Sequence, residues 1–489
     1  MEPWLEPLYD AEGIRAVDTW AIEDQGVPSA QLMEAAGAAL AEAVAGLAPQ
    51  GPVRILCGKG NNGGDGKIAA RRLSELGFEV DTALLFSDEA PEDFDAWLAG
   101  SGAIVDAIFG TGFSGTPREP AAAAIAAVNR CRAPVVSCDI ASGVDASSGE
   151  VAGDAVEADL TVSFHAAKLG QRIAPGKRRT GELRVVPIGI PAGAPGEPAA
   201  GTICRSVLEL APRRGPDSTK FSSGQVTIAG GSRGLTGAVR MSSSAAIRAG
   251  AGYATVAIPT DLEPVFELGQ PEVMSVGCPG GDGRLVPVSV KAVLAAFERA
   301  AAGVLGPGLG RDPGSLELAR EVAAAIECPL VIDADGLNAF AGRASMIASR
   351  DQPTLLTPHA GELGRLLDRE STEIDGHRLG AARDAARAAQ AIVVLKGDDT
   401  IVTDGTRIAV NALSAPALAT AGSGDVLSGI LAALMARGLE PFAAACAGVL
   451  AHARAGRDAA RRIGAAESVI ATDVIDSIAA GLRPDPAVE

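Results

Sequence analysis

Three acidic residues, two at the ends of predicted strands and one in a glycine-rich loop that opens a predicted helix, are the side chains of this chain best placed for chemistry. Asp106 and Asp139 follow two apolar runs, and Asp425 lies in the glycine-rich run 419–429. A carboxylate in such a place can take a proton from a bound hydroxyl, and the neighbouring backbone N–H groups can hold an anion. Each acid alone could equally cap a helix, so the interpretation depends on the residues around it.

Three polar loops follow predicted strands in the N-terminal part of the chain. The strand 53–57 runs into the sequence GKGNNGGDG at 58–66, and a predicted helix follows over 67–77. Asp106 and Asp139 lead into the sequences AIFGTG and IASGVD. Ligands of open α/β sheets bind beyond the carboxyl ends of the strands, so we expect these loops to meet at one crevice. The glycine run is neither a G-x-G-x-x-G nor a Walker A motif.

Five further polar loops lie in the C-terminal part, and the first four of them follow predicted strands. They are GPGLG at 306–310, DADGLN at 333–338, TPHAGE at 357–362, KGDDT at 396–400 and AGSGDVLSG at 421–429. The last is predicted to open a long helix near Gly424, whose N–H groups can hold a phosphate beside Asp425. The four histidines lack zinc-ligand spacing with a cysteine, which argues against a zinc site. His359 could be a site residue or a buried structural donor.

The N-terminal motifs together resemble the epimerase domain of the NAD(P)H-hydrate repair enzymes, over nearly all of residues 10–190. The resemblance implies that the hydrated dinucleotide contacts Asn61, Asn62, Gly63, Gly64, Asp65, Gly110, Thr111, Gly112, Phe113, Ser114, Gly115, Thr116 and Asp139. It also implies a potassium ion ligated by Asn62, Asp106 and Ser142, whose hard oxygen donors suit an alkali cation. Ala141 stands where the family usually has proline. Lys168 stands where the family commonly has lysine, although the default for a lysine is a solvated surface position.

The C-terminal motifs, with the run PEVM at 271–274, resemble the ribokinase-like dehydratase domain of the same family, over about 216–485. This resemblance implies hydrate contacts at Ala238, Gly308, His359 and Asp425. It implies adenine-nucleotide contacts at Lys396, Gly397, Asp398, Asp399, Thr400 and Gly424. The stretch KFSSG at 220–224 departs from the usual His-Lys-Gly form.

Together the two resemblances imply one chain that repairs hydrated NADH and NADPH in two steps. The N-terminal domain would interconvert the R and S hydrates, with Asp139 as acid and base and potassium held by Asp106. The C-terminal domain would dehydrate the S hydrate, with Asp425 as base and with ADP, accompanied by magnesium, converted to AMP and phosphate. Two alternatives stay open: a small-molecule kinase, which the C-terminal pattern also resembles, and a non-catalytic dinucleotide-binding module.

Two stretches of alternating strands and helices must position these loops. The apolar runs predicted as strands are 53–57, 80–86, 103–106, 135–138 and 160–164, then 225–229, 254–258, 303–305, 330–332, 354–356 and 392–395. Their spacing is typical of βα units in mostly parallel sheets. Because the stretch 189–198 is rich in Pro and Gly, we interpret it as the start of a linker. The prediction is a Rossmann-like three-layer α/β/α domain over 1–205, followed by a ribokinase-like α/β domain over 206–489.

Composition narrows the class of protein. The chain has 42 basic and 60 acidic residues, a net charge of −18, so it lacks the basic surface that nucleic-acid binding requires. No apolar run approaches the roughly 18 residues of a membrane span, and no signal peptide is visible. The seven scattered cysteines favour a reducing compartment over a disulfide framework. We therefore expect a cytoplasmic protein with no membrane or nucleic-acid partner. The resemblance adds an enzyme with small-molecule substrates, and we also expect a homo-oligomer.

Overall fold

The computed structural model describes residues 1–88, 90–194 and 198–484. Its contacts divide the chain into two compact units, Pro7–Gly201 and Thr202–Glu489, with Glu2–Glu6 belonging to the second. The boundary expected after residue 205 stays a prediction. That Glu2–Glu6 joins the second unit was not expected from the sequence. Residues 195–197 of the predicted linker lie outside the described part of the chain.

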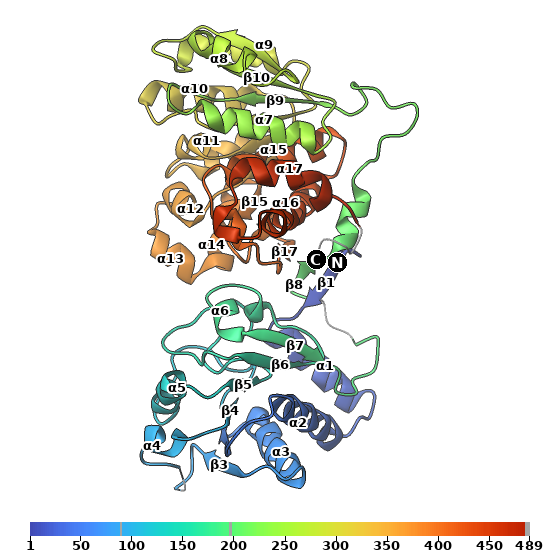
Figure 1. Cartoon of the computed structure of the whole chain (residues 1–489), viewed down its shortest axis with the longest axis vertical. Coiled ribbons are helices and arrows are strands. Elements are labelled where there is room, and N and C mark those ends of the chain that lie inside the picture. Colours follow the sequence, from blue (N-terminus) through green and yellow to red (C-terminus); the bar gives the residue numbers. More distant parts are fainter. Residues whose placement is uncertain (89, 195–197, 485–489) are drawn as a thin grey trace. The chain divides into compact units, whose positions relative to one another are not determined.

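The first unit is built on a parallel six-stranded sheet in the order β3-β2-β4-β5-β6-β7 (Figure 1). Its strands are β2 (Val53–Cys57), β3 (Val80–Leu84), β4 (Ala103–Ala107), β5 (Val135–Cys138), β6 (Leu160–Phe164) and β7 (Glu182–Val186). Its helices are α1 (Ala11–Glu23), α2 (Ser29–Gly46), α3 (Asn61–Glu75), α4 (Phe94–Leu98), α5 (Ala121–Arg130) and the short α6 (Lys177–Thr180). The predicted parallel sheet is confirmed.

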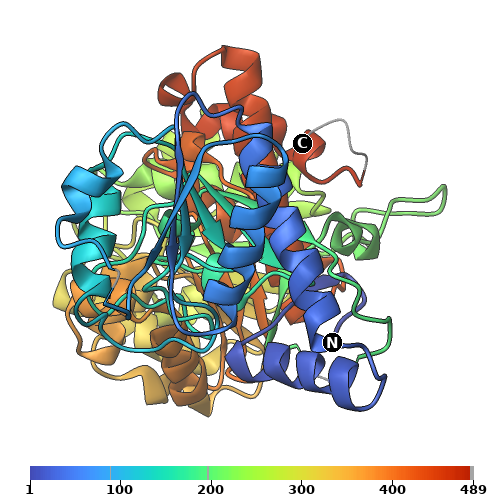
Figure 2. The same ribbon diagram turned by 90° about the horizontal axis from the view of Figure 1, so that it is seen from below.

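Helices cover both faces of this sheet because successive strand side chains point to opposite faces. Ile55 and Val105 pack in one apolar cluster with residues of α1, α2 and α3, whereas Leu56 and Ile104 pack with α4 and α5. Figure 2 shows the blue helices on one side of the strands and the light-blue and cyan helices on the other. The unit therefore has the predicted three-layer α/β/α architecture.

The glycine-rich run of this unit is helical, so the predicted helix start at residue 67 is wrong. Helix α3 begins at Asn61, and residues 61–66 form its first turns. A Cβ atom at Gly66 would lie only 2.7 Å from the Cβ of Ala107 and 2.9 Å from the Sγ of Cys57. Glycine is thus required because the helix lies against the ends of β2 and β4. This close packing places the N-terminus of α3 at the carboxyl edge of the sheet.

The other sheet has eleven strands in the order β1-β8-β17-β16-β15-β14-β13-β12-β9-β10-β11, and all of it belongs to the second unit except residues 7–8 of β1 and 200–201 of β8. The strands are β1 (Leu5–Leu8), β8 (Ala200–Ile203), β9 (Gln225–Ala229), β10 (Tyr253–Pro259), β11 (Val273–Cys278), β12 (Ala302–Leu305), β13 (Leu330–Ile332), β14 (Thr354–Leu356), β15 (Ile392–Leu395), β16 (Ile401–Thr403) and β17 (Ile408–Val410). Pairing is parallel from β11 to β15 and antiparallel from β15 through β16 to β17. The carboxyl ends of the parallel strands again gather the loops with the motifs.

Four helices pack over one face of this sheet: α7 (Thr236–Arg248), α15 (Ser423–Ala436), α16 (Pro441–Ile463) and α17 (Ala471–Gly481) (Figure 1). The other helices are α8 (Glu263–Glu267), α9 (Val290–Phe297), α10 (Pro313–Ala325), α11 (Asp335–Asn338), α12 (Ala360–Leu367), α13 (Ser371–Gly376) and α14 (Arg378–Ala389). Trp4 belongs to the same apolar cluster, with its ring 6.3 Å from that of Phe442 on α16. This contact explains why the first residues group with the second unit.

Two absences concern the described part of the chain. No helix there is long and apolar enough to cross a membrane. All seven cysteines are free.

Two candidate active sites

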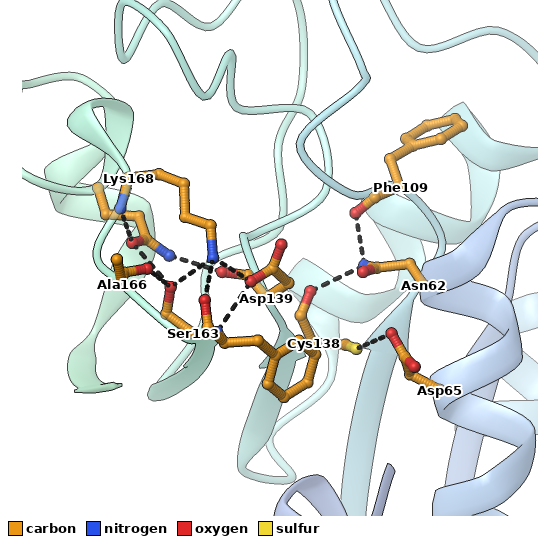
Figure 3. Close-up of polar contacts among 10 residues, drawn as sticks. Asn62, Asp65, Phe109, Cys138, Asp139, Ser163, Ala166 and Lys168 are labelled. Carbon is orange, nitrogen blue, oxygen red and sulfur yellow. Dashed lines mark hydrogen bonds and ion pairs between the residues drawn. The ribbon is translucent and has the colours of Figure 1, made fainter. Parts of the chain in front are cut away.

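The three predicted loops of the first unit meet at the carboxyl ends of β2, β4 and β5. The side-chain Nδ2 of Asn62 on α3 donates to the carbonyl oxygens of Phe109 and Cys138, each at 2.8 Å (Figure 3). One amide group therefore connects all three loops. A cavity of about 740 Å³ opens beside it, lined by these loops together with residues of α1 and α2. The crevice predicted from the sequence is present.

The predicted substrate contacts of this unit divide into two groups. Those that line the cavity are Asn61, Asn62, Asp65, Gly110, Thr111, Gly112, Phe113 and Asp139; those outside its lining are Gly63, Gly64, Ser114, Gly115 and Thr116. A Cβ at Gly64 would lie 2.9 Å from the Sδ of Met33, so this glycine provides room for packing against α2. Thr116 donates its hydroxyl to the carbonyl of Ala152. Gly64 and Thr116 therefore shape the loops around the cavity.

Lys168 is wholly buried and paired with Asp139, so the default expectation of a solvated lysine is wrong. Its Nζ donates to the Oδ1 of Asp139, to the Oγ of Ser163 at 3.0 Å and to the carbonyl of Phe164 at 2.9 Å. The backbone N–H of Phe164 donates to the same carboxylate oxygen at 3.0 Å. Figure 3 shows Asp139 between Lys168 and the loop that Asn62 fixes. Both Asp139 and Lys168 line the cavity, with one carboxylate oxygen fixed by two donors.

Two more carboxyl groups line the cavity beside this pair. Burial, with Asp139 and Asp18 close by, raises the pKa of Asp65 to about 8. Burial and Asp139 likewise raise the pKa of Asp18, on α1, to about 6, and Lys168 acts in the opposite direction. Carboxyl groups that exchange protons near neutral pH are typical of sites for acid–base chemistry. Asp18 was missed because α1 precedes every motif and nothing in its local sequence distinguishes this acid.

The raised pKa of Asp65 predicts a pH-dependent stability. The folded protein keeps a proton on Asp65 that the unfolded chain releases above about pH 4. The free energy of unfolding therefore falls as the pH rises from about 4 towards 8, by at most about 1.4 kcal/mol for each pH unit. We expect Asp65→Asn to flatten this fall. Thermal unfolding of the parent and of Asp65→Asn at pH 5 and pH 8 measures the change in stability. An equal loss of stability in both proteins would contradict the raised pKa of Asp65.

The residues predicted to hold potassium lie together next to the backbone of Phe109. Asp106 is fully buried and accepts hydrogen bonds from the Oγ of Ser137 at 2.8 Å, from the backbone N–H of Ser142 at 2.9 Å and from the hydroxyl of Ser142. The backbone N–H of Phe109 donates to the same Ser142 hydroxyl at 2.8 Å, and its carbonyl accepts from Asn62. Among the described residues, no cationic side chain pairs with Asp106.

A buried carboxylate with only neutral partners is an unfavourable arrangement. Burial raises the pKa of Asp106 above its usual value, and the hydrogen bonds from Ser142 and Ser137 oppose that change. A cation ligated by the carboxylate would compensate its charge, and hydroxyl and amide oxygens are suitable further ligands. Asn62, Asp106 and Ser142 therefore fit a hard cation.

In the second unit, Lys396 lies at the centre of a cluster of acids. Its Nζ, at the end of β15, lies 3.2 Å from the Oδ1 of Asp333, after β13, and 3.6 Å from the Oε2 of Glu362, on α12. A Cβ at Gly424 would lie 3.3 Å from this Nζ, so the N-terminus of α15 adjoins the lysine. Burial and Asp333 raise the pKa of Asp425 to about 7, against the opposing effect of Lys396. Asp425 can therefore accept a proton near neutral pH.

Three other residues were predicted as hydrate contacts. Ala238 on α7 and Gly308 are neighbours, because a Cβ at Gly308 would lie 3.2 Å from that of Ala238. His359 caps α12 through its Nδ1, which accepts the N–H of Gly361 at 3.0 Å. Its side chain is 55% exposed, so the alternative of a buried structural donor is wrong. Capping orients the imidazole while its Nε2 stays 3.6 Å from Glu362.

Most of the predicted nucleotide contacts line a second cavity, of about 320 Å³. The contacts in its lining are Lys396, Gly397, Asp398, Thr400 and Gly424. Asp399 is instead buried in an ion pair with Arg378, whose Nε lies 2.9 Å from its carboxylate. This ion pair fixes the turn at 396–400 through a residue that does not line the cavity. The stretch 220–224 lies outside the lining, with Phe221 exposed and its ring edge-on to Tyr253.

Comparisons with known proteins agree with this division into two units. A family model described as NAD(P)H-hydrate dehydratase matches residues 226–480, and one described as YjeF-related protein N-terminus matches 29–101 and 85–170. The bifunctional NAD(P)H-hydrate repair enzyme Nnr of Moorella thermoacetica is 35% identical over 97% of this chain and 96% of its own length. The enzymes of that name from Salinibacter ruber and Escherichia coli K12 are 36% and 33% identical, over 98% of this chain and 96% and 94% of their own lengths.

Solved structures include the ADP/ATP-dependent NAD(P)H-hydrate dehydratase of Bacillus subtilis, co-crystallised with ATP and Mg²⁺. It is 25% identical, covers 56% of this chain and 94% of its own, and has a TM-score of 0.49. The argument is carried by the relatives that align over nearly their whole length. On their identity and coverage, this chain belongs to the family of bifunctional NAD(P)H-hydrate repair enzymes.

Proposed function

We propose that the chain restores hydrated NADH and NADPH in two consecutive steps at two separate sites. The observation that carries the proposal is the alignment with bifunctional repair enzymes over both units. The geometry supports it, because each unit places a carboxyl group with a near-neutral pKa among its glycine-rich loops: the pKa of Asp65, which lines the first cavity, is about 8, and that of Asp425, at the N-terminus of α15, is about 7. Such groups suit reactions that move protons at a ring carbon or hydroxyl.

In the first unit, we propose that the residues around the 740 Å³ cavity interconvert the R and S hydrates. Asp139 takes and returns the proton, and Lys168 fixes its carboxylate. Arg15 and Lys59, which also line the cavity, offer positive charge to the dinucleotide phosphates. Asn62, Asp106 and Ser142 would hold a potassium ion, which supplies positive charge beside the substrate. The sequence motifs gave no indication of Arg15, because this residue lies on α1, outside the motifs.

In the second unit, we propose dehydration of the S hydrate with ADP. Asp425 takes the proton of the ring hydroxyl, whose oxygen forms a bond to the β-phosphorus while the bond to the AMP oxygen breaks. The N–H groups at 422–424, with Lys396 beside them, stabilise the charge on the transferring phosphoryl group. Phosphate then leaves with the electrons of the carbon–oxygen bond. A proton leaves the adjacent ring carbon, and the double bond between the two carbons is restored.

Magnesium is proposed as the counter-ion of the nucleotide phosphates. Mg²⁺ is commonly held by one or two carboxylates together with substrate phosphates. Asp333, 1% exposed and close enough to raise the pKa of Asp425, is the carboxylate of this unit that would hold it. A cytoplasmic location and a homo-oligomeric state also remain predictions.

The proposed function is tested by recovery of NADH from its hydrates. The purified chain is incubated with each epimer separately, with ADP or with ATP, and the absorbance of the dihydronicotinamide is followed. We expect recovery from the S hydrate with nucleotide, and from the R hydrate only when the first site is active. A phosphate ester that accumulates without NADH would show a small-molecule kinase, and tight hydrate binding without turnover would show a binding module.

The potassium site gives a separate prediction. Asp106→Asn keeps the shape of the side chain but removes the negative charge that a cation would balance. We expect epimerisation to lose its stimulation by potassium and to fall about tenfold or more, while dehydration of the S hydrate is unchanged. Rates measured with potassium chloride against choline chloride provide the test. Potassium stimulation of equal size in the variant and the parent would rule out this ligand set.

A further inference from the structure

His452 on α16 lines the nucleotide cavity and carries a buried nitrogen without a hydrogen-bond partner. The side chain lines the 320 Å³ cavity, is 7% exposed, and its Nε2 has no hydrogen-bond partner. Among the described residues that line this cavity, it alone has a buried side-chain nitrogen or oxygen without a partner. Buried polar atoms are rarely left unpaired, so this nitrogen is arranged for a group that enters the cavity.

The imidazole is neutral at physiological pH. Burial lowers the pKa of His452 to about 4, Lys396 lowers it further, and a hydrogen bond with the backbone of Ser423 opposes the change. Because that bond raises the pKa, the ring is its donor, and because Nε2 is unpaired, the donor is Nδ1. Nε2 then carries a lone pair and no hydrogen, which makes it an acceptor.

The surroundings indicate which part of a nucleotide this acceptor meets. Lys396 and Gly424, at the N-terminus of α15, mark the end of the cavity suited to phosphates. Much of the remaining wall is apolar: Leu413, Pro416, Leu418, Leu427 and Val449. An apolar wall with a few placed polar groups is typical of a site for a base and its sugar.

We propose that the Nε2 of His452 accepts a hydrogen bond from the nucleoside part of the adenine nucleotide and thereby sets nucleotide selectivity. This inference rests on the proposed function, because it assigns a contact within the same nucleotide site. The available donors are the exocyclic amine of adenine and the ribose hydroxyls. A nucleoside with a carbonyl in place of the amine would meet the lone pair of Nε2 with another acceptor.

Two substitutions distinguish the loss of this hydrogen bond from a loss of side-chain packing. An asparagine at 452 can keep the donor to Ser423 but cannot reach the position of Nε2, whereas a glutamine can place an oxygen acceptor there. We expect His452→Asn to weaken ADP binding about five- to tenfold and His452→Gln to stay within about twofold of the parent. Binding of ADP to the full chain is measured by titration calorimetry, with unfolding temperatures recorded without nucleotide. Cys446→Ala, buried on the same helix but outside the cavity lining, is the matched control.

Nucleotide analogues identify the donor. Inosine diphosphate lacks the amine, and the 2′-deoxy and 3′-deoxy forms of ADP each lack one hydroxyl. The analogue that lacks the true donor should bind the parent more weakly and should show no further loss in His452→Asn. Unchanged ADP binding in His452→Asn, equal losses in both His452 variants, or additive losses with all three analogues would overturn the proposal. If the parent itself binds no ADP, the proposed dehydratase function fails instead.

Discussion

Asp425→Asn is expected to reduce dehydration of the S hydrate by about 10²–10⁴-fold while epimerisation continues at the parent rate. Asparagine has the shape of aspartate, but it cannot accept the proton of the ring hydroxyl. The carboxylate lies at the first turn of α15, in the cluster that contains Lys396 and Asp333. The first unit has its own cavity and acids, so its reaction should not depend on Asp425.

The same substitution should leave the fold intact or more stable. Burial and Asp333 raise the pKa of Asp425 to about 7, so above that pH the folded protein carries an unfavourable negative charge that asparagine removes. Loss of dehydration with an unchanged or higher unfolding temperature would therefore locate the effect in the chemistry. Asp476→Asn is the control, because this exposed acid of α17 makes only a loose 3.7 Å pair with Arg248. Loss of both activities in Asp425→Asn would contradict two separate sites.

Lys168→Met is expected to abolish epimerisation and to destabilise the first unit by about 3–5 kcal/mol. The lysine is fully buried, and removing it leaves Asp139, whose side chain is 13% exposed, without its cation. The pKa of Asp18, which Lys168 lowers, would rise further. Two effects thus combine: the acid–base carboxylate loses its orientation, and the folded unit retains an unbalanced charge.

The double variant Asp139→Asn/Lys168→Met separates these two effects. It removes both charges, so we expect much of the lost stability to return while epimerisation stays absent. Denaturant unfolding is followed by tryptophan fluorescence, to which Trp20 and Trp97 of the first unit and Trp4 of the second contribute, and dehydration of the S hydrate serves as an internal control. An active Lys168→Met protein, or a double variant less stable than the single one, would refute the role given to this pair.

Much of the fold could be predicted from local sequence. The apolar runs at 53–57, 135–138 and 225–229 coincide with β2, β5 and β9, because a strand buried on both faces needs a nearly continuous apolar run. Strand β7 has no such run: its residues are exposed or half-buried, so its position depends on pairing with β6. Strand β1 was missed for a related reason, since a glutamate and a proline interrupt its two leucines and leave no apolar run.

The candidate sites were predictable where a motif follows a strand and unpredictable elsewhere. The sequence by itself determined the loops at Asn62, Asp106, Asp139 and Asp425, because glycines and acids at strand ends are local features. Only the tertiary structure decided that Lys168 is buried against Asp139 and that Asp18 faces the same cavity. It likewise placed an unpaired nitrogen of His452 beside the nucleotide loops. Burial and charge pairing depend on distant segments packing together, and no local pattern specifies that packing.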